Sequence, residues 1–211
     1  KEHAEIKAKL SKALIAHAYN VVDIGFLPEG ERLQSSKGNS PYDVAHADAL
    51  LARGAFMYAD EASNFTHTFK TALVTLTRFL EKSGMPTLRY WAVLGLQMRG
   101  KPAVDASHDA LVATLKDPST CVRIAAARAL GEFGSEADMQ AALQLLLAHA
   151  DWSKNDVFTA MAALDALNAL GQKAAPIAAQ LKALPAKGPA PDARLKEYIP
   201  RMLEELRERF P

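Results

Sequence analysis

Histidine and aspartate residues occur twice at a spacing that metal sites use. Asp43 precedes His46 by three residues, and His108 lies between Asp105 and Asp109. On a helix, residues three or four positions apart share a face, so carboxylate and imidazole groups could converge on one cation. Two or three such residues also arise readily on any charged helix surface. We therefore assign no metal ligand in this chain.

Arg89, Tyr90 and Trp91 form a second candidate, because an arginine beside aromatic rings can stack on a sugar or hold a sulfate. An internal repeat, described below, aligns Arg89 with Arg123 and Trp91 with Ala125. Ala125 falls on the apolar face of its helix. This register favours burial of the cluster within the first repeat over exposure to a ligand.

Cys121 is the one cysteine of the chain, which excludes an intrachain disulfide and a cysteine-based zinc site. It lies at a helix start near Arg123, where the pKa of a thiol can fall. We favour the alternative, a small buried or half-buried residue. The sequence contains no nucleophile elbow and no glycine-rich phosphate loop, so it predicts no catalytic residue.

The charge of the chain is balanced, with 25 Lys and Arg against 24 Asp and Glu. Such a balance gives no overall field that would attract nucleic acid or an anionic membrane, so neither is expected as a partner. No apolar stretch reaches the length of a membrane span. Because the sequence starts at Lys1 within a helical pattern, we expect it to be a piece of a longer protein.

The elements that position these residues repeat along the chain. Residues 88–100 align with residues 122–134 and again with residues 159–171, at shifts of 34 and 37 positions. In each copy the apolar residues fall on one face of a helix, and a glycine follows. Other amphipathic stretches lie between the copies. Helix pairs that recur in this way bury their apolar faces only by stacking on one another, which predicts an all-α solenoid.

Three regions are expected around this stack. Residues 1–64 would form an N-terminal helix, a loop and a second helix that begins at Ser40-Pro-Tyr-Asp43, all packed on the repeats. Residues 65–184 would contain the repeats. Residues 185–211 would form a proline-containing linker and a charged helix that caps the stack.

The turn aspartate and the following Val-Arg-x-x-Ala-Ala-x-Ala-Leu pattern resemble HEAT and HEAT-like repeats. In that family an aspartate of the turn and an arginine of the helix commonly form a ladder between neighbouring units. The resemblance implies ladder roles for four residues: Arg89, Asp117, Arg123 and Asp151. The third copy has Ala160 at the arginine position, so the ladder should stop there.

Three further segments narrow the resemblance. These segments occur in this order along the chain: Asp23-Ile-Gly-Phe-Leu-Pro-Glu29, Ser40-Pro-Tyr-Asp43, and Leu88-Arg-Tyr-Trp-Ala92, which begins the first repeat copy. This arrangement is similar to the C-terminal part of bacterial type I sulfatases. The resemblance implies a parent enzyme that hydrolyses sulfate esters of carbohydrates with calcium and formylglycine, and that is exported to the periplasm or beyond. This chain has no Cys/Ser-x-Pro/Ala-x-Arg motif, so no catalytic or metal residue and no cofactor is expected in it.

The sequence thus predicts a non-catalytic scaffold or interaction region, whose partner is a sulfatase catalytic domain in cis or another protein. The alternative is a free-standing HEAT-repeat adaptor that binds a protein on its concave surface. A sulfatase tail should expose an apolar face around Ile24, Phe26 and Leu27, whereas an adaptor should have polar caps at both ends. Residues expected to contact a partner are Phe26, Leu27, Tyr42 and Trp152.

Overall fold

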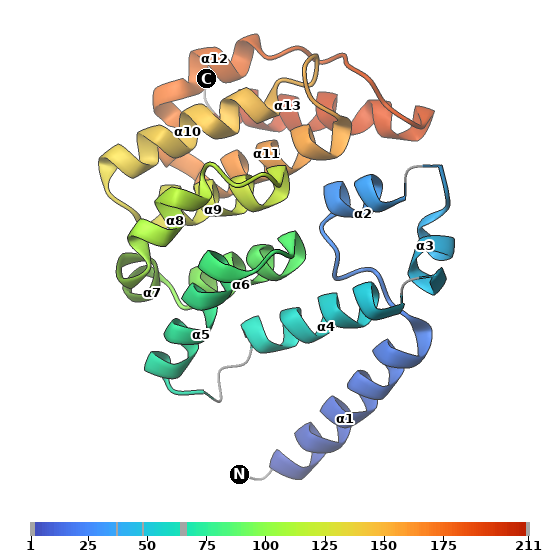
Figure 1. The fold of residues 1–211 in the computed structure, drawn as a ribbon. Coiled ribbons are helices and arrows are strands. Elements are labelled where there is room, and N and C mark those ends of the chain that lie inside the picture. The colour runs from blue at the N-terminus through green and yellow to red at the C-terminus, as the bar shows by residue number, and fades with distance from the viewer. Residues whose placement is uncertain (1–2, 37, 48, 64–66, 210–211) are drawn as a thin grey trace.

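The computed structural model describes residues 3–36, 38–47, 49–63 and 67–209, and this part of the chain contains helices and no β-strand (Figure 1). The predicted all-α class is confirmed. The helices are α1 Ala4–Val21, α2 Glu29–Ser35, α3 Pro41–Ala47, α4 Ala49–Ser63, α5 Phe69–Lys82, α6 Pro86–Met98, α7 Lys101–Ala106, α8 His108–Thr114, α9 Thr120–Phe133, α10 Glu136–Ala150, α11 Val157–Leu170, α12 Ala178–Ala183 and α13 Tyr198–Arg209.

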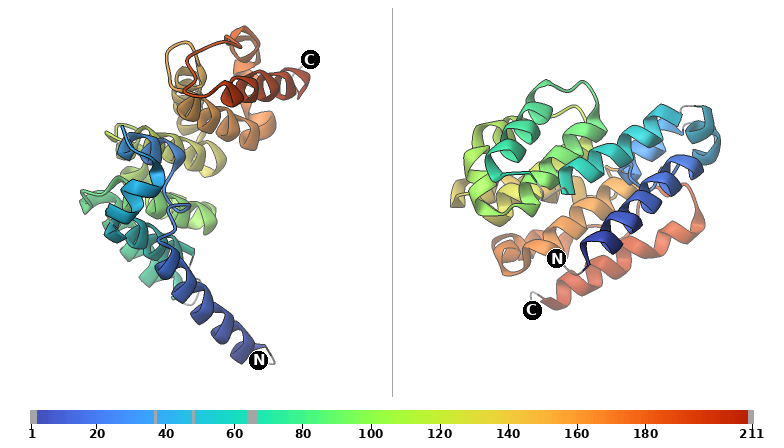
Figure 2. Two further views of the ribbon diagram at one scale, coloured as in Figure 1. Left: turned by 90° about the vertical axis from the view of Figure 1, so that its right-hand side faces the viewer. Right: turned by 90° about the horizontal axis from the view of Figure 1, so that it is seen from below.

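The helices stack in two layers, with α1 at one end and α12 and α13 at the other (Figures 1 and 2). One layer consists of α4, α6, α9, α11 and α13, each packed against the next. We call it the inner layer, because α2 lies against it. The outer layer consists of α5, α7, α8, α10 and α12. The predicted solenoid is therefore present, and the final helix α13 continues the inner layer.

Local sequence signals explain where the repeat helices begin. The hydroxyl of Ser119 accepts a hydrogen bond from the Val122 amide and caps α9. Ser135 and Asp138 form a capping box at the start of α10, and Asp156 accepts two backbone N–H bonds at the start of α11. Each cap satisfies amides that have no partner inside their own helix. The caps of α9 and α11 thus lie along one edge of the stack, where the inner-layer helices begin.

Small residues make the contacts between inner-layer helices. Ala126 and Ala129 of α9 and Ala160 and Ala163 of α11 are fully buried. At Gly95 of α6, an added Cβ would lie 3.1 Å from the carbonyl oxygen of Ala62 in α4, the neighbouring inner-layer helix. The spacing between neighbouring helices is therefore set by β-carbons and by a missing side chain, with leucines filling the space between the layers.

The N-terminal region differs from the repeats. Helix α1 is held near its C-terminal end, where Ala18 is buried and Arg53 of α4 lies 3.4 Å from the carbonyl oxygen of Tyr19. The loop that was expected before Ser40 contains a helix, because residues 29–35 form α2. Pro28 precedes this helix, and Glu29 and Glu31 occupy its first turn, where carboxylates stabilise a helix N-terminus. No helix in the described part of the chain is long and apolar enough to cross a membrane.

Candidate functional site: a groove along the inner layer

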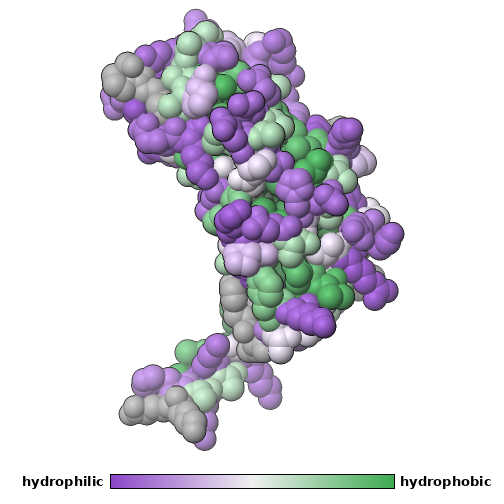
Figure 3. Space-filling view, turned by 90° about the vertical axis from the view of Figure 1, so that its left-hand side faces the viewer, coloured by the Kyte–Doolittle hydropathy of each residue, from purple (hydrophilic) through white to green (hydrophobic). Residues whose placement is uncertain are grey.

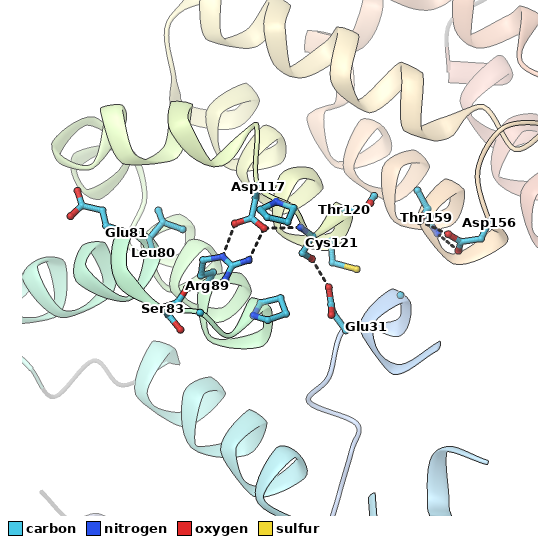
Figure 4. Close-up of a pocket in the computed structure, with 15 residues that line it drawn as sticks. Glu31, Leu80, Glu81, Ser83, Arg89, Asp117, Thr120, Cys121, Asp156 and Thr159 are labelled. Carbon is cyan, nitrogen blue, oxygen red and sulfur yellow. Dashed lines mark hydrogen bonds and ion pairs between the residues drawn. The ribbon is translucent and has the colours of Figure 1, made fainter. Parts of the chain in front are cut away.

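A groove of about 730 Å³ lies along the edge of the stack where the inner-layer helices begin (Figure 4). Its walls come from the end of α5, the starts of α6, α9 and α11, and the first turn of α2. Its polar side chains include Glu31, Glu81, Arg89, Asp117 and Asp156. The groove exists because three successive inner-layer helices, α6, α9 and α11, begin at one edge, and because α2 closes one side of it.

Arg89 and Asp117 join two repeats inside this groove. Arg89 Nε donates to Asp117 Oδ2 at 2.6 Å and Arg89 Nη2 donates to Oδ1 at 2.8 Å. The two side chains are only 11% and 7% exposed. Asp117 also accepts the backbone N–H of Ser119. The hydrogen bond with Asp117 raises the pKa of Arg89, so the guanidinium stays charged. The structure thus brings two of the residues with predicted ladder roles together across two repeats, and we call this pair the Arg89–Asp117 rung.

Arg123 and Asp151, which also have predicted ladder roles, make other contacts in the structure. Arg123 instead donates to the carbonyl oxygens of Asp117 and Pro118, and its Nε lies 3.4 Å from His149 Nε2. Asp151 pairs with Lys154 at 2.8 Å. The physical reason is the longer turn at residues 152–155, in which Ser153 and Lys154 provide local partners for the carboxylate of Asp151.

Helix α2 contacts the groove through Glu31 and Gly30. Ser119 Oγ donates to a carboxylate oxygen of Glu31. A Cβ added at Gly30 would lie 2.8 Å from Cys121 Sγ, so the α2 backbone passes directly over the thiol. Burial, together with the charge of Glu31, raises the pKa of Cys121 to about 11. The thiol is therefore protonated at neutral pH, and the arginine-activated alternative is wrong.

The loop before α2 packs on the first repeat. Trp91 Nε1 donates to the carbonyl oxygen of Phe26 at 2.9 Å, and the Phe26 ring meets that of Phe56 edge-on at 5.0 Å. Leu27 is buried and Phe26 is half-buried. Leu27 is thus unavailable to a partner in this structure, which corrects that prediction, and the expected exposed apolar face does not lie in this loop.

Beyond α2, a second cavity of about 210 Å³ lies on the inner face of α6, α9 and α11. It is lined mainly by apolar side chains, among them Tyr90, Leu94 and Phe158. At its rim Arg128 pairs with Asp165 at 3.1 Å. The two cavities share Gly30 and Cys121 as lining residues. Helix α2 therefore separates two parts of one inner surface.

Residues 73–168 match the family of HEAT repeats. The matched range runs from α5 to α11 and contains the groove and the Arg89–Asp117 rung. A search of curated proteins and a search of solved structures each found no match. HEAT repeats stack into extended surfaces that bind other proteins, so this region of the chain indicates a scaffold or interaction role.

The structure corrects the prediction for Trp152, which lies within the matched range. It was expected to contact a partner from an exposed turn, but it is only 2% exposed. Its Nε1 donates to the carbonyl oxygen of Pro189 at 2.8 Å. The segment of residues 185–191 runs back over the ring, and Gly188 passes so close that a Cβ there would overlap Trp152. Trp152 is therefore part of the core.

The remaining candidates lie outside the groove of the HEAT repeats. Tyr42 is 68% exposed and stacks on His46, so its contact with a partner stays a prediction. His108 Nε2 lies 3.0 Å from both carboxylate oxygens of Asp138 in the neighbouring α10. Among the described residues, no group of three or more His, Cys, Asp or Glu side chains is arranged to hold a metal ion.

Proposed function

We propose that this chain is the non-catalytic, C-terminal helical-repeat region of a sulfatase, and that it serves there as a scaffold or interaction surface. The observation that carries the proposal is a contact between two of the segments that resemble sulfatases. Trp91 of Leu88-Arg-Tyr-Trp-Ala92 donates to Phe26 of Asp23-Ile-Gly-Phe-Leu-Pro-Glu29 at 2.9 Å. Segments that pack on each other form one structural unit, which supports reading them together.

An apolar stripe on α1 further supports a large partner. Ile6, Leu10 and Leu14 lie one turn apart and are 57%, 63% and 58% exposed. The N-terminal part of α1 stands clear of the rest of the molecule (Figure 3). A row of large apolar side chains on one helix face is typical of a surface that another protein covers. Under this proposal, the catalytic domain in cis covers it.

The polar residues of the groove are used for structure, which fits a supporting role. Arg89 and Asp117 neutralise each other, Asp156 caps α11, and the Cys121 thiol is protonated. The chemistry of sulfate ester hydrolysis, with its calcium ion and formylglycine, would belong to the catalytic domain of the parent protein.

The test begins with the gene that encodes this chain. We expect its reading frame to continue upstream into a Cys/Ser-x-Pro/Ala-x-Arg motif, and the complete protein to release sulfate from a sulfated carbohydrate. Leu10→Asp in that protein should disturb the docking of the two regions, whereas Met57→Asp, at another exposed apolar residue, serves as the matched control. A reading frame that starts within a few residues of Lys1 would rule the proposal out.

The alternative function is a free-standing adaptor that binds a protein segment on the inner face of its HEAT repeats. The position of α2 favours it, because a short helix of this chain already occupies that face. An adaptor would bind its partner without any sulfatase domain in the same polypeptide, so the upstream reading frame separates the two functions.

A further inference from the structure

Helix α2 is held to the inner layer by few contacts. No described side chain of α2 is fully buried, whereas Leu27 and Pro28, directly before it, are buried. Arg32 of α2 pairs with Glu29 of the same helix and not with the repeats. The preceding loop is therefore a firm anchor, and α2 is a short arm that extends from it over the groove.

The contacts that α2 does make are specific. Glu31 accepts a hydrogen bond from the hydroxyl of Ser119 and lies close enough to Arg89 for its charge to raise the pKa of that guanidinium. Gly30 fits over Cys121 because it has no side chain. These two contacts define the segment that the groove accepts. It has a small residue that lies over Cys121, followed by an acidic residue that accepts a hydrogen bond from Ser119.

The surface beside and beneath α2 is continuous across three repeats. The polar groove of about 730 Å³ and the apolar cavity of about 210 Å³ adjoin at Gly30 and Cys121. Lifting α2 would join them into one groove from the Arg89–Asp117 rung to Phe158. Such a groove has an apolar wall for one side chain and hydrogen-bond donors for a carboxylate, as helix-binding grooves have.

We propose that this groove binds a short helical segment of another protein, and that α2 occupies the groove until this partner displaces it. The segment carries the chemistry of Pro28-Glu-Gly-Glu31: a proline before the helix, a small residue at Cys121 and an acidic residue at Ser119. The partner takes the place of α2, which swings away about the loop anchored by Phe26 and Leu27. The proposal rests on the interaction role of the repeats and is independent of a sulfatase parent.

The first measurement follows the exposure of Cys121, the one thiol of the chain. Glu31→Lys removes the acceptor for Ser119 and places a like charge near Arg89, so α2 should spend more time away from the groove. We expect modification of Cys121 by a maleimide to become about tenfold faster, because the thiol is uncovered. Glu29→Lys makes the same charge change in the same helix, and the exposed side chain of Glu29 has its ion pair, within the described part of the chain, with Arg32. This control should change the rate less than about twofold.

The second measurement uses a fluorescent synthetic peptide with the sequence of residues 22–36. Because a covered groove lowers apparent affinity in proportion to its open fraction, Glu31→Lys should bind the peptide about tenfold more tightly than the wild type or Glu29→Lys. The bound peptide should slow the modification of Cys121. A peptide with lysine at the position of Glu31 should not bind.

Three results would overturn the proposal: equal Cys121 rates in the two variants, peptide binding of equal strength to both, or no binding to either. The urea midpoints of wild type and variants are compared as well. Equal midpoints show that a faster modification of Cys121 comes from the movement of α2 and not from a loss of overall stability. Glu31→Ala is the second variant should Glu31→Lys not fold. None of these results bears on the upstream reading frame or on sulfate release, so failure here is distinct from failure of the sulfatase proposal.

Discussion

The buried ion pair between Arg89 and Asp117 allows the coupling between two repeats to be measured. Both side chains are almost fully enclosed and meet through two hydrogen bonds of 2.6 and 2.8 Å. Removal of one partner leaves the other charge buried without compensation, which typically destabilises a protein by about 3–5 kcal/mol. We therefore expect Asp117→Ala to lower the free energy of unfolding by about 3–5 kcal/mol.

Asp165→Ala provides the matched control. Asp165 also pairs with an arginine of the preceding inner-layer helix, Arg128, but at 3.1 Å and with side chains that are 36% and 65% exposed. Solvent screens an exposed pair, so this variant should lose less than about 1 kcal/mol. The two variants remove the same chemical group and differ mainly in burial.

The assay is urea denaturation followed by circular dichroism, with hydrogen exchange of the α6 and α9 amides as a local readout. The double variant Arg89→Met with Asp117→Ala should lose less than the sum of the single losses, by about 0.5–3 kcal/mol, because neither charge remains unpaired. Equal losses for Asp117→Ala and Asp165→Ala, or strictly additive single losses, would refute the assignment of this pair as a buried link between repeats.

Three further predictions concern other parts of the chain. The hydrogen bond with Asp138 raises the pKa of His108, so its stabilising contribution is present below the ordinary pKa of about 6.5 and is lost as the pH rises through the raised value. The difference in urea midpoint between wild type and His108→Gln should therefore shrink from about pH 5.5 to about pH 8.5. Gly188→Ala should destabilise the chain by about 1–3 kcal/mol and shift the fluorescence of Trp152 to the red, because the added methyl group overlaps the indole. Leu10→Ser should change the free energy of unfolding by less than about 0.5 kcal/mol, since Leu10 is exposed; a larger loss would mean that the stripe is covered within the chain.

The repeats were predictable because their signals are local and periodic. The apolar spacing around Val122 and the caps at Ser119 and Asp156 determine where α9 and α11 lie. The ladder roles of Arg89 and Asp117 came from the resemblance to HEAT-like repeats, whose turn and helix positions these two residues match. In each case one short window of sequence, compared with its neighbour, contains the information.

The failures concern residues whose environment comes from distant parts of the chain. Trp152 is buried because residues 185–191 return over it. The sequence around Trp152 contains no signal that indicates this packing. Asp151 pairs within its own turn, because the residues inserted after it include Lys154. Helix α2 did carry a local signal, since Pro28 and two glutamates mark a helix start, but its position over Cys121 depends on tertiary packing.

The alanine contacts between inner-layer helices have a geometrical consequence. Helices that touch through methyl groups have no long side chains whose rotamers could absorb a change in volume. A bulkier residue at Ala126 or Ala163 would act as a wedge, and the tilt it introduces would be carried through every later helix to α13. The pitch of the superhelix, and hence the distance between its two ends, is therefore adjustable by single substitutions far from either end.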